Sequence, residues 1–369
     1  MIPFLSLKEQ TAKLKTEVLT ALEQVIDAQG FANGPKVAAF EQEFSSYLGV
    51  SSAICVNTGT TSLQAALIGA GVQPGDDVVT VAHTWISTAW AISYVGATPV
   101  FCDIDPSTCC MDPSLLEKAI TPKTKAILPV HLYGHPADLD AIISIAHRKG
   151  IPVIEDAAQS IGAKYKGKQT GTMGLVNATS FYPGKNLGAF GEGGAVMTND
   201  REIAARIVRL RDHAQSGRHH HTEIGYNWRL DGFQGAVLSI KLKHLDAWND
   251  RRRQIAAQYT QAFAELPGVR LLGQHAWAHP VWHIYPLFHD KRDQFRTSLE
   301  KQGVQSGVHY PTPVHMQPAY AHLNIQKGVL PETERAAASE LSLPMYPELS
   351  DDEVALVIAA VVNTAKELA

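Results

Sequence analysis

The sequence predicts an α/β fold, in which helices cover both faces of a mostly parallel β-sheet, followed by a smaller α+β domain. The first observation is that short β-branched runs alternate with helix-like segments from about residue 50 onward. This alternation is typical of a parallel sheet covered on both sides. The second observation is that the alternation stops near Phe233, where a long stretch with helical spacing begins.

The expected strands are the runs SAICVNTG, DDVVTV, TPVFCDI, KAILPVH, IPVIED, ATSFYP and GGAVMT. Helix-like segments such as TSLQAALIGAG and DLDAIISIAHRKG lie between several of them, and each ends on a glycine, which is a common helix C-terminal signal. In sheets of this kind, ligands bind beyond the carboxyl ends of the strands. Residues that follow these runs are therefore the candidates for chemistry.

The second part of the chain is expected to begin with a connecting helix. Apolar residues from Phe233 to Leu266 have approximately helical spacing, and the stretch ends at Pro267. We interpret its DRRR run, residues 250–253, as a solvated helix face. The large domain is placed at residues 1–245, with an N-terminal segment that is free to pack on the small domain, and the small domain at residues 246–369.

Composition excludes several classes of protein. The 369 residues, 45% hydrophobic and 18% charged, argue against disorder, and a formal charge of −4 without a basic stripe argues against nucleic-acid binding. The N-terminus lacks a secretory signal, and no apolar stretch approaches the roughly 18 residues of a membrane span. Four cysteines without CxxC pairing or metal-ligand spacing indicate reduced thiols. We expect a soluble cytoplasmic protein with no membrane or nucleic-acid partner and no metal.

The stretch TSFYPGKNLGAFGEGGAV, residues 179–196, holds one lysine, Lys185, among closely spaced glycines. It is not a phosphate-binding P-loop, because Thr179 stands five residues before Gly184 and Asn186 follows the lysine. The motifs GxGxxG after the first strand, HExxH and GxSxG are also absent. The glycines therefore indicate a tight turn around the lysine rather than a nucleotide loop.

Two further features lie at strand ends. IPVIED ends in Glu155 and Asp156, of which one is expected to face the strand-end crevice, although an ordinary helix cap for the following AAQS is the alternative. VNTGTTSLQAAL places a glycine and hydroxyls before a helix. Such a helix start suits a phosphate, with each charge-assisted hydrogen bond worth roughly 1.5–3 kcal/mol, and an ordinary N-cap is again the alternative.

Together, the lysine, the acid and the helix start match what pyridoxal phosphate requires. Lys185 would hold the aldehyde as a Schiff base and later move a proton. Asp156, 29 residues before Lys185, would pair with the pyridine nitrogen and keep it protonated. The helix start and Ser180 would hold the phosphate. An aromatic ring in HTWISTAW would cover the pyridine, and a core position is the alternative for Trp85.

Long segments along nearly the whole chain carry a family resemblance, among them GPKVAAFEQEF, GTTSLQAAL, VIEDAAQSIGAKYKGK, SFYPGKNLGAFGEGGA, GYNWRLDGFQGAVLSIKL and VHYPTPVHMQPAY. The chain resembles the DegT/DnrJ/EryC1/StrS family of sugar aminotransferases. The resemblance implies fold type I of aspartate aminotransferase, with a mixed, mostly parallel sheet, and a homodimer with shared active sites. It implies pyridoxal 5′-phosphate as cofactor, with pyridoxamine phosphate as its intermediate form. It also implies amino transfer from L-glutamate to a dTDP- or UDP-linked keto-sugar.

The resemblance assigns roles position by position. Lys185 is the catalytic lysine and Asp156 the partner of the pyridine nitrogen. The remaining cofactor contacts are Gln159 at the ring hydroxyl, Trp85 on the ring face, Gly59, Thr60 and Ser180 at the phosphate, and Asn227 at the phosphate from the other protomer. The sugar-side candidates are His309, Tyr310, His315 and Arg229, with packing or incidental surface placement as the alternative for the histidines.

Two candidates on the sugar side rest on weaker arguments. Tyr182, in the aromatic pair before Lys185, is as well explained by packing as by contact with the sugar. Three consecutive histidines, residues 219–221, cannot all point at one ion, so we predict no metal there. Of these we expect His220 to face the sugar.

The position of amination is predicted from the lysine block. FYPGKNLGAFGEGGA resembles members that act on 3-keto-6-deoxyhexoses, whereas members that act at C-4 more often carry a histidine shortly before the lysine. We therefore expect amination at C-3, with C-4 as the alternative. A non-catalytic regulator with the same fold is a second alternative, although no extra domain or recognition helix supports it. Lys185 argues against the dehydratases of the family, which carry histidine in its place.

Overall fold

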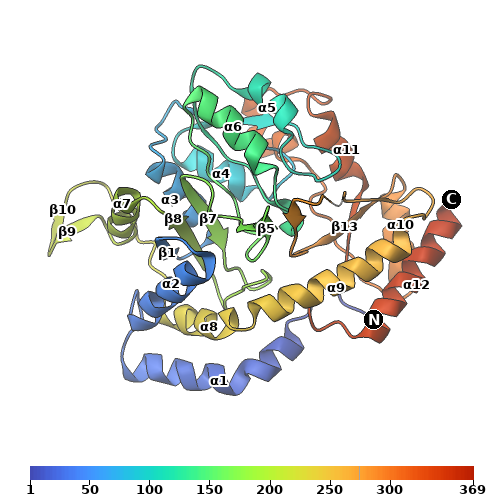
Figure 1. Cartoon of the computed structure of the whole chain (residues 1–369), viewed down its shortest axis with the longest axis horizontal. Coiled ribbons are helices and arrows are strands. Elements are labelled where there is room, and N and C mark those ends of the chain that lie inside the picture. The colour runs from blue at the N-terminus through green and yellow to red at the C-terminus, as the bar shows by residue number, and fades with distance from the viewer. Residues whose placement is uncertain (274) are drawn as a thin grey trace.

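The structure is a computed structural model that describes residues 1–273 and 275–369. Its larger part is an α/β body, and long helices from the C-terminal third of the chain lie along one side of it (Figure 1). The helices of the body are α1 (Lys8–Asp27), α2 (Pro35–Leu48), α3 (Gly59–Gly69), α4 (Ser87–Tyr94), α5 (Pro113–Ala119), α6 (Leu139–Lys149), α7 (Arg201–Arg211) and α8 (Gly232–Leu242), with the 3-10 turn η1 (Leu132–Gly134).

One half of the central sheet is parallel. Strand β2 (Asp77–Val81) lies between β3 (Thr98–Cys102) and β4 (Thr124–Ile127), and both pairs are parallel. The run IPVIED follows as an extended segment, joined to its neighbours by isolated parallel bridges rather than by a continuous ladder. One of these bridges pairs Asp156 with Ala178, which links this half to the rest of the sheet.

The other half contains the one reversed strand of this sheet among the described residues. Strand β8 (Gly194–Thr198) lies between β7 (Val176–Ser180) and β1 (Ser52–Val56) and is antiparallel to both. The expected mixed, mostly parallel sheet is therefore confirmed. Every segment except β8 points its carboxyl end toward the same edge, which places the residues that follow these segments next to one another.

Alternation along the strands explains why both faces of the sheet are covered. Ile54 and Val196 belong to a buried cluster with residues of α3 and α7. Cys55 and Ala195 belong to a second cluster with Phe40 of α2 and residues of α8. Because successive strand residues point to opposite faces, near-continuous apolar runs are buried by helices on both sides.

The predicted long helix after Phe233 is two helices. The first, α8, ends at Leu242, and α9 (Leu245–Phe263) begins after a two-residue break. The two helices have different partners: α8 contacts α1 and α2, whereas α9 contacts α12 (Asp351–Leu368). The chain bends between them because one straight helix cannot lie along both surfaces (Figure 1).

The interpretation of the DRRR run as a solvated face is wrong for Arg252. Asp250 is exposed, but Arg252 is 4% exposed. Its Nη1 donates to the backbone carbonyls of Trp282, His283 and Met345 at 3.3, 3.4 and 2.7 Å. This arginine therefore ties the connecting helix to two other segments.

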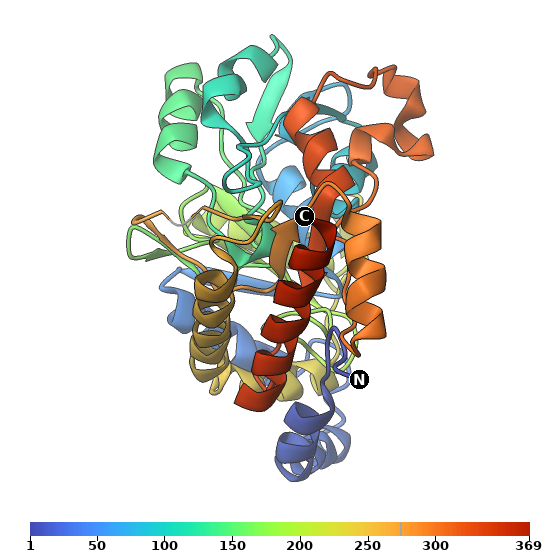
Figure 2. The same cartoon turned by 90° about the vertical axis from the view of Figure 1, so that its right-hand side faces the viewer.

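The C-terminal part is built on a small antiparallel sheet in which β13 (Tyr285–Phe288) lies between β11 (Arg270–Leu271) and β14 (Glu340–Leu343). Helix α12 lies between α9 and α10 (Arg292–Lys301) (Figure 2). The remaining elements here are the 3-10 turns η2 (Val314–Met316) and η3 (Pro318–Leu323) and helix α11 (Pro331–Ser339). Ile2 pairs with Val304, so the N-terminus packs on this part of the chain.

Two short pairings complete the fold. β5 (Lys164–Tyr165) pairs with both β6 (Lys168–Gln169) and β12 (Ala278–His279), so a strand of the C-terminal part pairs with the body. β9 (Gln215–Gly217) and β10 (His220–His221) form a two-stranded ribbon that projects from the body (Figure 1). The domain boundary at residue 245 stays a prediction.

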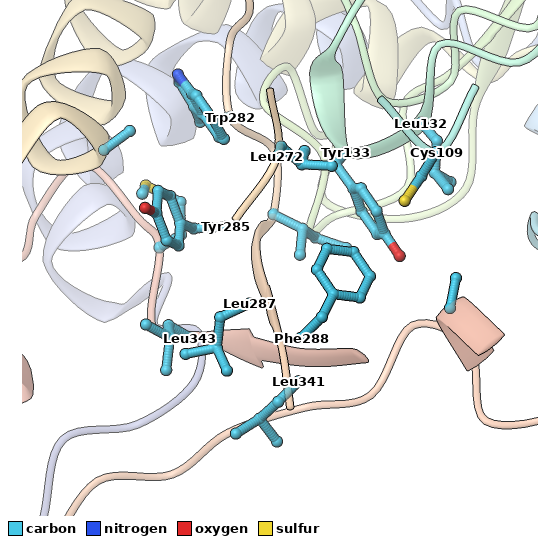
Figure 3. Close-up of a cluster of buried hydrophobic side chains, with 14 of the residues drawn as sticks. Cys109, Leu132, Tyr133, Leu272, Trp282, Tyr285, Leu287, Phe288, Leu341 and Leu343 are labelled. Carbon is cyan, nitrogen blue, oxygen red and sulfur yellow. The ribbon is translucent and has the colours of Figure 1, made fainter. Parts of the chain in front are cut away.

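A large apolar core joins the two parts of the chain. Figure 3 shows Tyr133 and Cys109 from the body packed near Phe288 of β13, with Leu341 and Leu343 of β14 in the same cluster. All four cysteines are buried with free thiols. In the two described ranges, no helix is long and apolar enough to cross a membrane.

Candidate active site

A cavity of about 730 Å³ lies at the edge of the central sheet where the strands end. Its size falls within the range of small-molecule sites. Ten of the fourteen site residues predicted from the sequence line it: Gly59, Thr60, Trp85, Asp156, Gln159, Ser180, Tyr182, Lys185, His309 and Tyr310. The fold therefore brings together residues that lie up to 251 positions apart in the chain.

Lys185 lies on the turn between β7 and β8, facing the cavity. Its backbone N–H donates to the Tyr182 carbonyl at 2.8 Å, which closes the turn. A side chain at position 188 would lie 2.3 Å from the Pro183 carbonyl oxygen, so this turn requires Gly188. Burial lowers the pKa of Lys185 to about 8, against the attraction of Asp156, which raises it. The amine therefore has a neutral fraction near neutral pH and can accept a proton or act as a nucleophile.

Asp156 is the carboxylate of the pair that faces the cavity. Its Oδ2 accepts from the Thr88 hydroxyl at 2.9 Å and its Oδ1 from the Ala158 N–H at 3.1 Å. Burial raises the pKa of Asp156 overall, and those two donors and Lys185 offset part of the rise. The carboxylate is thus held in a fixed orientation where it can pair with a cationic N–H group.

Glu155 points away from the cavity and holds the loop before β7. Its carboxylate accepts from the backbone N–H groups of Gly171, Met173 and Gly174 at 2.6–2.7 Å. His131 Nε2 lies 2.9 Å from its Oε2. Burial raises the pKa of Glu155, but the hydrogen bonds and charge of His131 and the backbone donors lower it overall. The two adjacent acids therefore have separate tasks.

The start of α3 is both a capped helix end and an anion cradle. Thr58 Oγ1 accepts from the Thr61 N–H at 3.0 Å, which is the N-cap expected as the alternative. Among the described residues, the N–H groups of Gly59 and Thr60 have no acceptor, and Ser180 stands opposite them. A Cβ on Gly59 would lie 2.5 Å from Ser180 Cβ, so the close approach requires glycine. Two free N–H groups and a hydroxyl at a helix N-terminus are suited to a phosphate.

Trp85 and Tyr310 form an aromatic wall. Trp85 is 55% exposed at the cavity, so the alternative of a core tryptophan is wrong. Its ring lies 5.5 Å from that of Tyr310 between centroids. The Tyr310 hydroxyl accepts from Gln159 Nε2 at 3.2 Å, and Gln159 Oε1 accepts from the Tyr133 N–H at 2.6 Å. Both ends of the Gln159 amide are therefore fixed at the wall.

His309 also lines the cavity and is contributed by the C-terminal part of the chain. Its ring stacks on Phe4 at 5.3 Å between centroids, and its Nδ1 lies 2.8 Å from Ser342 Oγ. Burial, with a smaller contribution from the Lys185 charge, lowers the pKa of His309 to about 4. The imidazole is therefore neutral near neutral pH.

The sequence did not single out four other lining residues, Phe4, Leu5, Glu192 and His283. His283 Nδ1 lies 3.1 Å from Asn186 Oδ1, next to Lys185 in the chain. No local pattern marks His283, because it lies in the bend before β13, in a segment that reaches the cavity only through tertiary packing. Glu192 lies within the glycine-rich stretch around Lys185, residues 179–196, and this position was the signal in the sequence that could have identified it.

Four predicted site residues do not line the cavity of their own chain. His220 lies exposed on the β9–β10 ribbon, with its Nδ1 2.7 Å from Ser216 Oγ. Asn227 is exposed, and Arg229 pairs with Asp212. His315 is buried, with Nε2 3.3 Å from Glu334 Oε1, so the structure gives it the packing role that was the alternative.

The described residues hold no group of three or more histidine, cysteine, aspartate or glutamate side chains that could bind a metal ion. The arrangement instead offers one amine with a lowered pKa, one oriented carboxylate and one anion cradle around a common space. These groups can hold an organic cofactor by its phosphate and by a ring nitrogen, and can move protons beside it.

Comparisons with known proteins agree with this chemistry. The model of the DegT/DnrJ/EryC1/StrS aminotransferase family matches residues 12–362. The chain is 45% identical to dTDP-3-amino-3,4,6-trideoxy-alpha-D-glucose transaminase of Streptomyces venezuelae, over 100% of this chain and 97% of that protein. It is 41% identical to UDP-2-acetamido-2-deoxy-3-oxo-D-glucuronate aminotransferase of Pseudomonas aeruginosa, over 98% of this chain and 100% of that protein.

Solved structures give the same result. The crystal structure of S. venezuelae DesV in complex with a ketimine intermediate superposes with a TM-score of 0.97 at 45% identity, covering 99% of this chain and 98% of that one. The structure of NtdA from Bacillus subtilis with bound cofactor PMP has a TM-score of 0.93 at 32% identity, covering 99% of this chain and 85% of that one.

Proposed function

The chain belongs to the DegT/DnrJ/EryC1/StrS aminotransferase family, and we propose that it transfers an amino group from L-glutamate to C-3 of a nucleoside-diphosphate-linked keto-sugar. It is an aminotransferase, and its cofactor is pyridoxal phosphate. The observation that carries the proposal is the meeting of Lys185, Asp156 and the α3 cradle in one cavity.

Pyridoxal phosphate, when bound, supplies an electron sink for the carbanion that forms next to the transferred nitrogen. The chain supplies the binding groups and the proton transfers. The N–H groups of Gly59 and Thr60 and the hydroxyl of Ser180 would bind the phosphate, and Asp156 would hold the proton on the ring nitrogen. Lys185 would take the proton from the substrate carbon in one half-reaction and return a proton in the other, because its pKa lies near the working pH.

Both substrates would use the same cavity in turn. Glutamate delivers its amino group and leaves as 2-oxoglutarate, and the keto-sugar then enters. The open mouth beside Trp85 and Tyr182, which are 55% and 54% exposed, supports this exchange. In this proposal Tyr182, His309 and Tyr310 contact the sugar.

We further propose that two copies of the chain complete each site. Asn227, Arg229 and His220 lie outside the cavity of their own chain, and His220 is carried on a projecting ribbon (Figure 1). Exposed aromatic side chains, among them Trp90 and Tyr94, offer apolar area for an interface. Asn227 would then contact the phosphate of the partner's cofactor, and Arg229 and His220 would lie on the sugar side.

The choice of C-3 rests on the lysine block and on the relatives. The two relatives compared above carry 3-amino or 3-oxo in their names, and their sugars are linked to dTDP or UDP. Amination at C-4 remains the competing outcome. A non-catalytic regulator is disfavoured, because Lys185, Asp156 and the α3 cradle line one cavity.

The test is an assay of 2-oxoglutarate release by the pyridoxal-phosphate-loaded protein with glutamate and matched 3-keto and 4-keto sugar nucleotides. NMR of the product identifies the carbon that carries nitrogen. We expect turnover with the 3-keto substrate and a 3-amino product. Turnover with the 4-keto sugar alone would replace C-3 by C-4. If glutamate still delivers its amino group but no keto-sugar nucleotide accepts it, the proposed class of acceptor is rejected.

A further inference from the structure

A buried carboxyl group stands behind His309 and has no place in the reaction described so far. Glu340 is the first residue of β14 and is 0% exposed. It is not among the residues that line the cavity. Successive residues of β14 alternate in direction, so Glu340 and Ser342 share one face while Leu341 and Leu343 lie on the other, in the apolar core of Figure 3. The polar face of this strand is directed at His309.

Three hydrogen bonds connect these side chains in series. The backbone N–H of His309 donates to Glu340 Oε2 at 2.6 Å, and the Ser342 hydroxyl donates to Glu340 Oε1. The oxygen of that hydroxyl lies 2.8 Å from His309 Nδ1. Backbone pairing between Gly307 and Ser342, with N–O distances of 3.0 and 2.9 Å, fixes the spacing of the two segments. The carboxylate thus holds both the main chain and, through the serine, the ring of His309.

A serine hydroxyl has one proton, so this series has a direction. When the hydroxyl donates to Glu340, its oxygen must accept from His309, and the ring proton lies on Nδ1. Nε2 then carries a lone pair, because His309 is neutral near neutral pH. Nδ1 and Cε1 lie against Ser342 and Gly307, so the Nε2 edge is the one that remains for the cavity.

We propose that Glu340 and Ser342 are positioning residues that set which ring nitrogen of His309 carries the proton, and so whether His309 presents an acceptor or a donor to the cavity. With Glu340 ionised, Nε2 accepts a hydrogen bond from the Lys185 ammonium or from a substrate hydroxyl. With Glu340 protonated on Oε1, the carboxyl donates to Ser342, Ser342 donates to Nδ1, and Nε2–H becomes a donor suited to a substrate oxygen.

Both forms of Glu340 are accessible around neutral pH. Burial raises the pKa of Glu340 to about 8, while Ser342, the His309 N–H and Arg292 of α10 lower it. The other titratable groups whose pKa is affected by the charge of Glu340 are Cys109, Tyr133 and Tyr310. Burial raises the pKa of each of these three groups, so they stay neutral while Glu340 titrates.

The direct test is the tautomer of His309, read by ¹⁵N NMR of histidine-labelled, pyridoxal-phosphate-loaded protein. The His309 signals are assigned by their loss in His309→Gln. In the wild type above pH 8 we expect the proton on Nδ1. Glu340→Gln should place it on Nε2 at neutral and alkaline pH, because the amide oxygen must accept from the His309 N–H and the amide N–H₂ then faces Ser342. The same tautomer in both proteins above pH 8 would overturn the proposal.

A second set of variants keeps the test valid if Glu340→Gln does not fold. Ser342→Ala removes the link and should leave a mixture of tautomers, and Ser342→Thr, which restores a hydroxyl, should recover the wild-type state. A pure wild-type tautomer in Ser342→Ala would also overturn the proposal. Ser339→Ala is the matched control, because Ser339 is a nearby buried serine whose hydroxyl donates to the Arg335 carbonyl.

The kinetic consequence rests on the proposed function, whereas the NMR result does not. Ser342→Ala should lower kcat/KM for the keto-sugar about tenfold, the size expected for one misdirected hydrogen bond, and leave the affinity for pyridoxal phosphate unchanged. Ser342→Thr should restore kcat/KM. If the tautomer of His309 shifts as expected but no keto-sugar is turned over, the proposed substrate is rejected, whereas the positioning role of Glu340 and Ser342 stands.

Discussion

Replacing Gly59 by alanine tests the anion cradle at the start of α3. The new Cβ would lie 2.5 Å from Ser180 Cβ and 2.8 Å from its Oγ, distances that real contacts do not show. Ser180 Cβ is fixed to the backbone of β7, so either this strand end or the helix start must move. The movement separates the Ser180 hydroxyl from the N–H groups of Gly59 and Thr60, which have no other acceptor among the described residues.

The size of the effect follows from the number of donors that lose alignment. Each hydrogen bond to a charged group contributes about 1.5–3 kcal/mol, and loss of one or two should cost about 2–5 kcal/mol of binding. Because 1.4 kcal/mol is tenfold in affinity, the Kd for pyridoxal phosphate should rise roughly 30-fold to several thousand-fold. The effect on pyridoxal, which lacks the phosphate, should be far smaller.

The assay is equilibrium binding of pyridoxal phosphate and of pyridoxal to the cofactor-free protein, with unfolding followed in parallel. Gly69→Ala, at the other end of the same helix, is the control, since its Cβ would meet only the side chains of Ile203 and Ile207, at 3.0 and 3.2 Å. A folded Gly59→Ala protein that binds pyridoxal phosphate within about threefold of the wild type would refute the cradle. An equal loss for both ligands would show general damage instead.

Three further substitutions test other parts of the structure. Lys185→Met should abolish turnover and, without cofactor, should stabilise the fold most below pH 8. The pKa of wild-type Lys185 falls from 10.5 in the unfolded chain to about 8 on folding, so between these two values the unfolded chain binds more protons than the folded chain. Wild-type stability should therefore rise from pH 8 to 10.5 in thermal melts. Arg252→Met should lower the unfolding free energy by about 3–5 kcal/mol, because three carbonyls lose their donor, whereas Asp250→Ala at an exposed position should change it by about 0.5 kcal/mol or less in denaturant titrations. Ser350→Ala should cost about 1 kcal/mol in the same assay by removing the capping box of α12.

Local signals predicted the residues that follow strands. Asp156 ends an extended run, Lys185 lies on the turn after β7, and Gly59 begins α3 after β1, so their positions at one sheet edge follow from strand direction. The sheet class was predictable for the same reason. The reversed direction of β8 was not, because its run GGAVMT carries no mark of direction.

The errors arose where tertiary contacts decide the outcome. Arg252 has the helical spacing of a surface residue, and its burial depends on carbonyls that are 30 to 93 positions away. The break before α9 depends on which helices its two halves contact. His283 and Phe4 reach the cavity from segments that no local pattern connects to it.

In the proposed function, the groups that would hold the cofactor and most of those that would contact the sugar come from different parts of the chain. The groups expected to hold the cofactor, Asp156, Ser180 and Lys185 among them, lie at or after strand ends of the central sheet, whereas His309, Tyr310 and His283 come from the C-terminal part. The two walls are held together by the core around Tyr133, whose hydroxyl donates to the His309 carbonyl at 2.5 Å. A change in this core would therefore move His309 relative to the strand ends that carry Asp156 and Lys185. Sugar specificity can change through the C-terminal segments while the proton chemistry of Lys185 is retained.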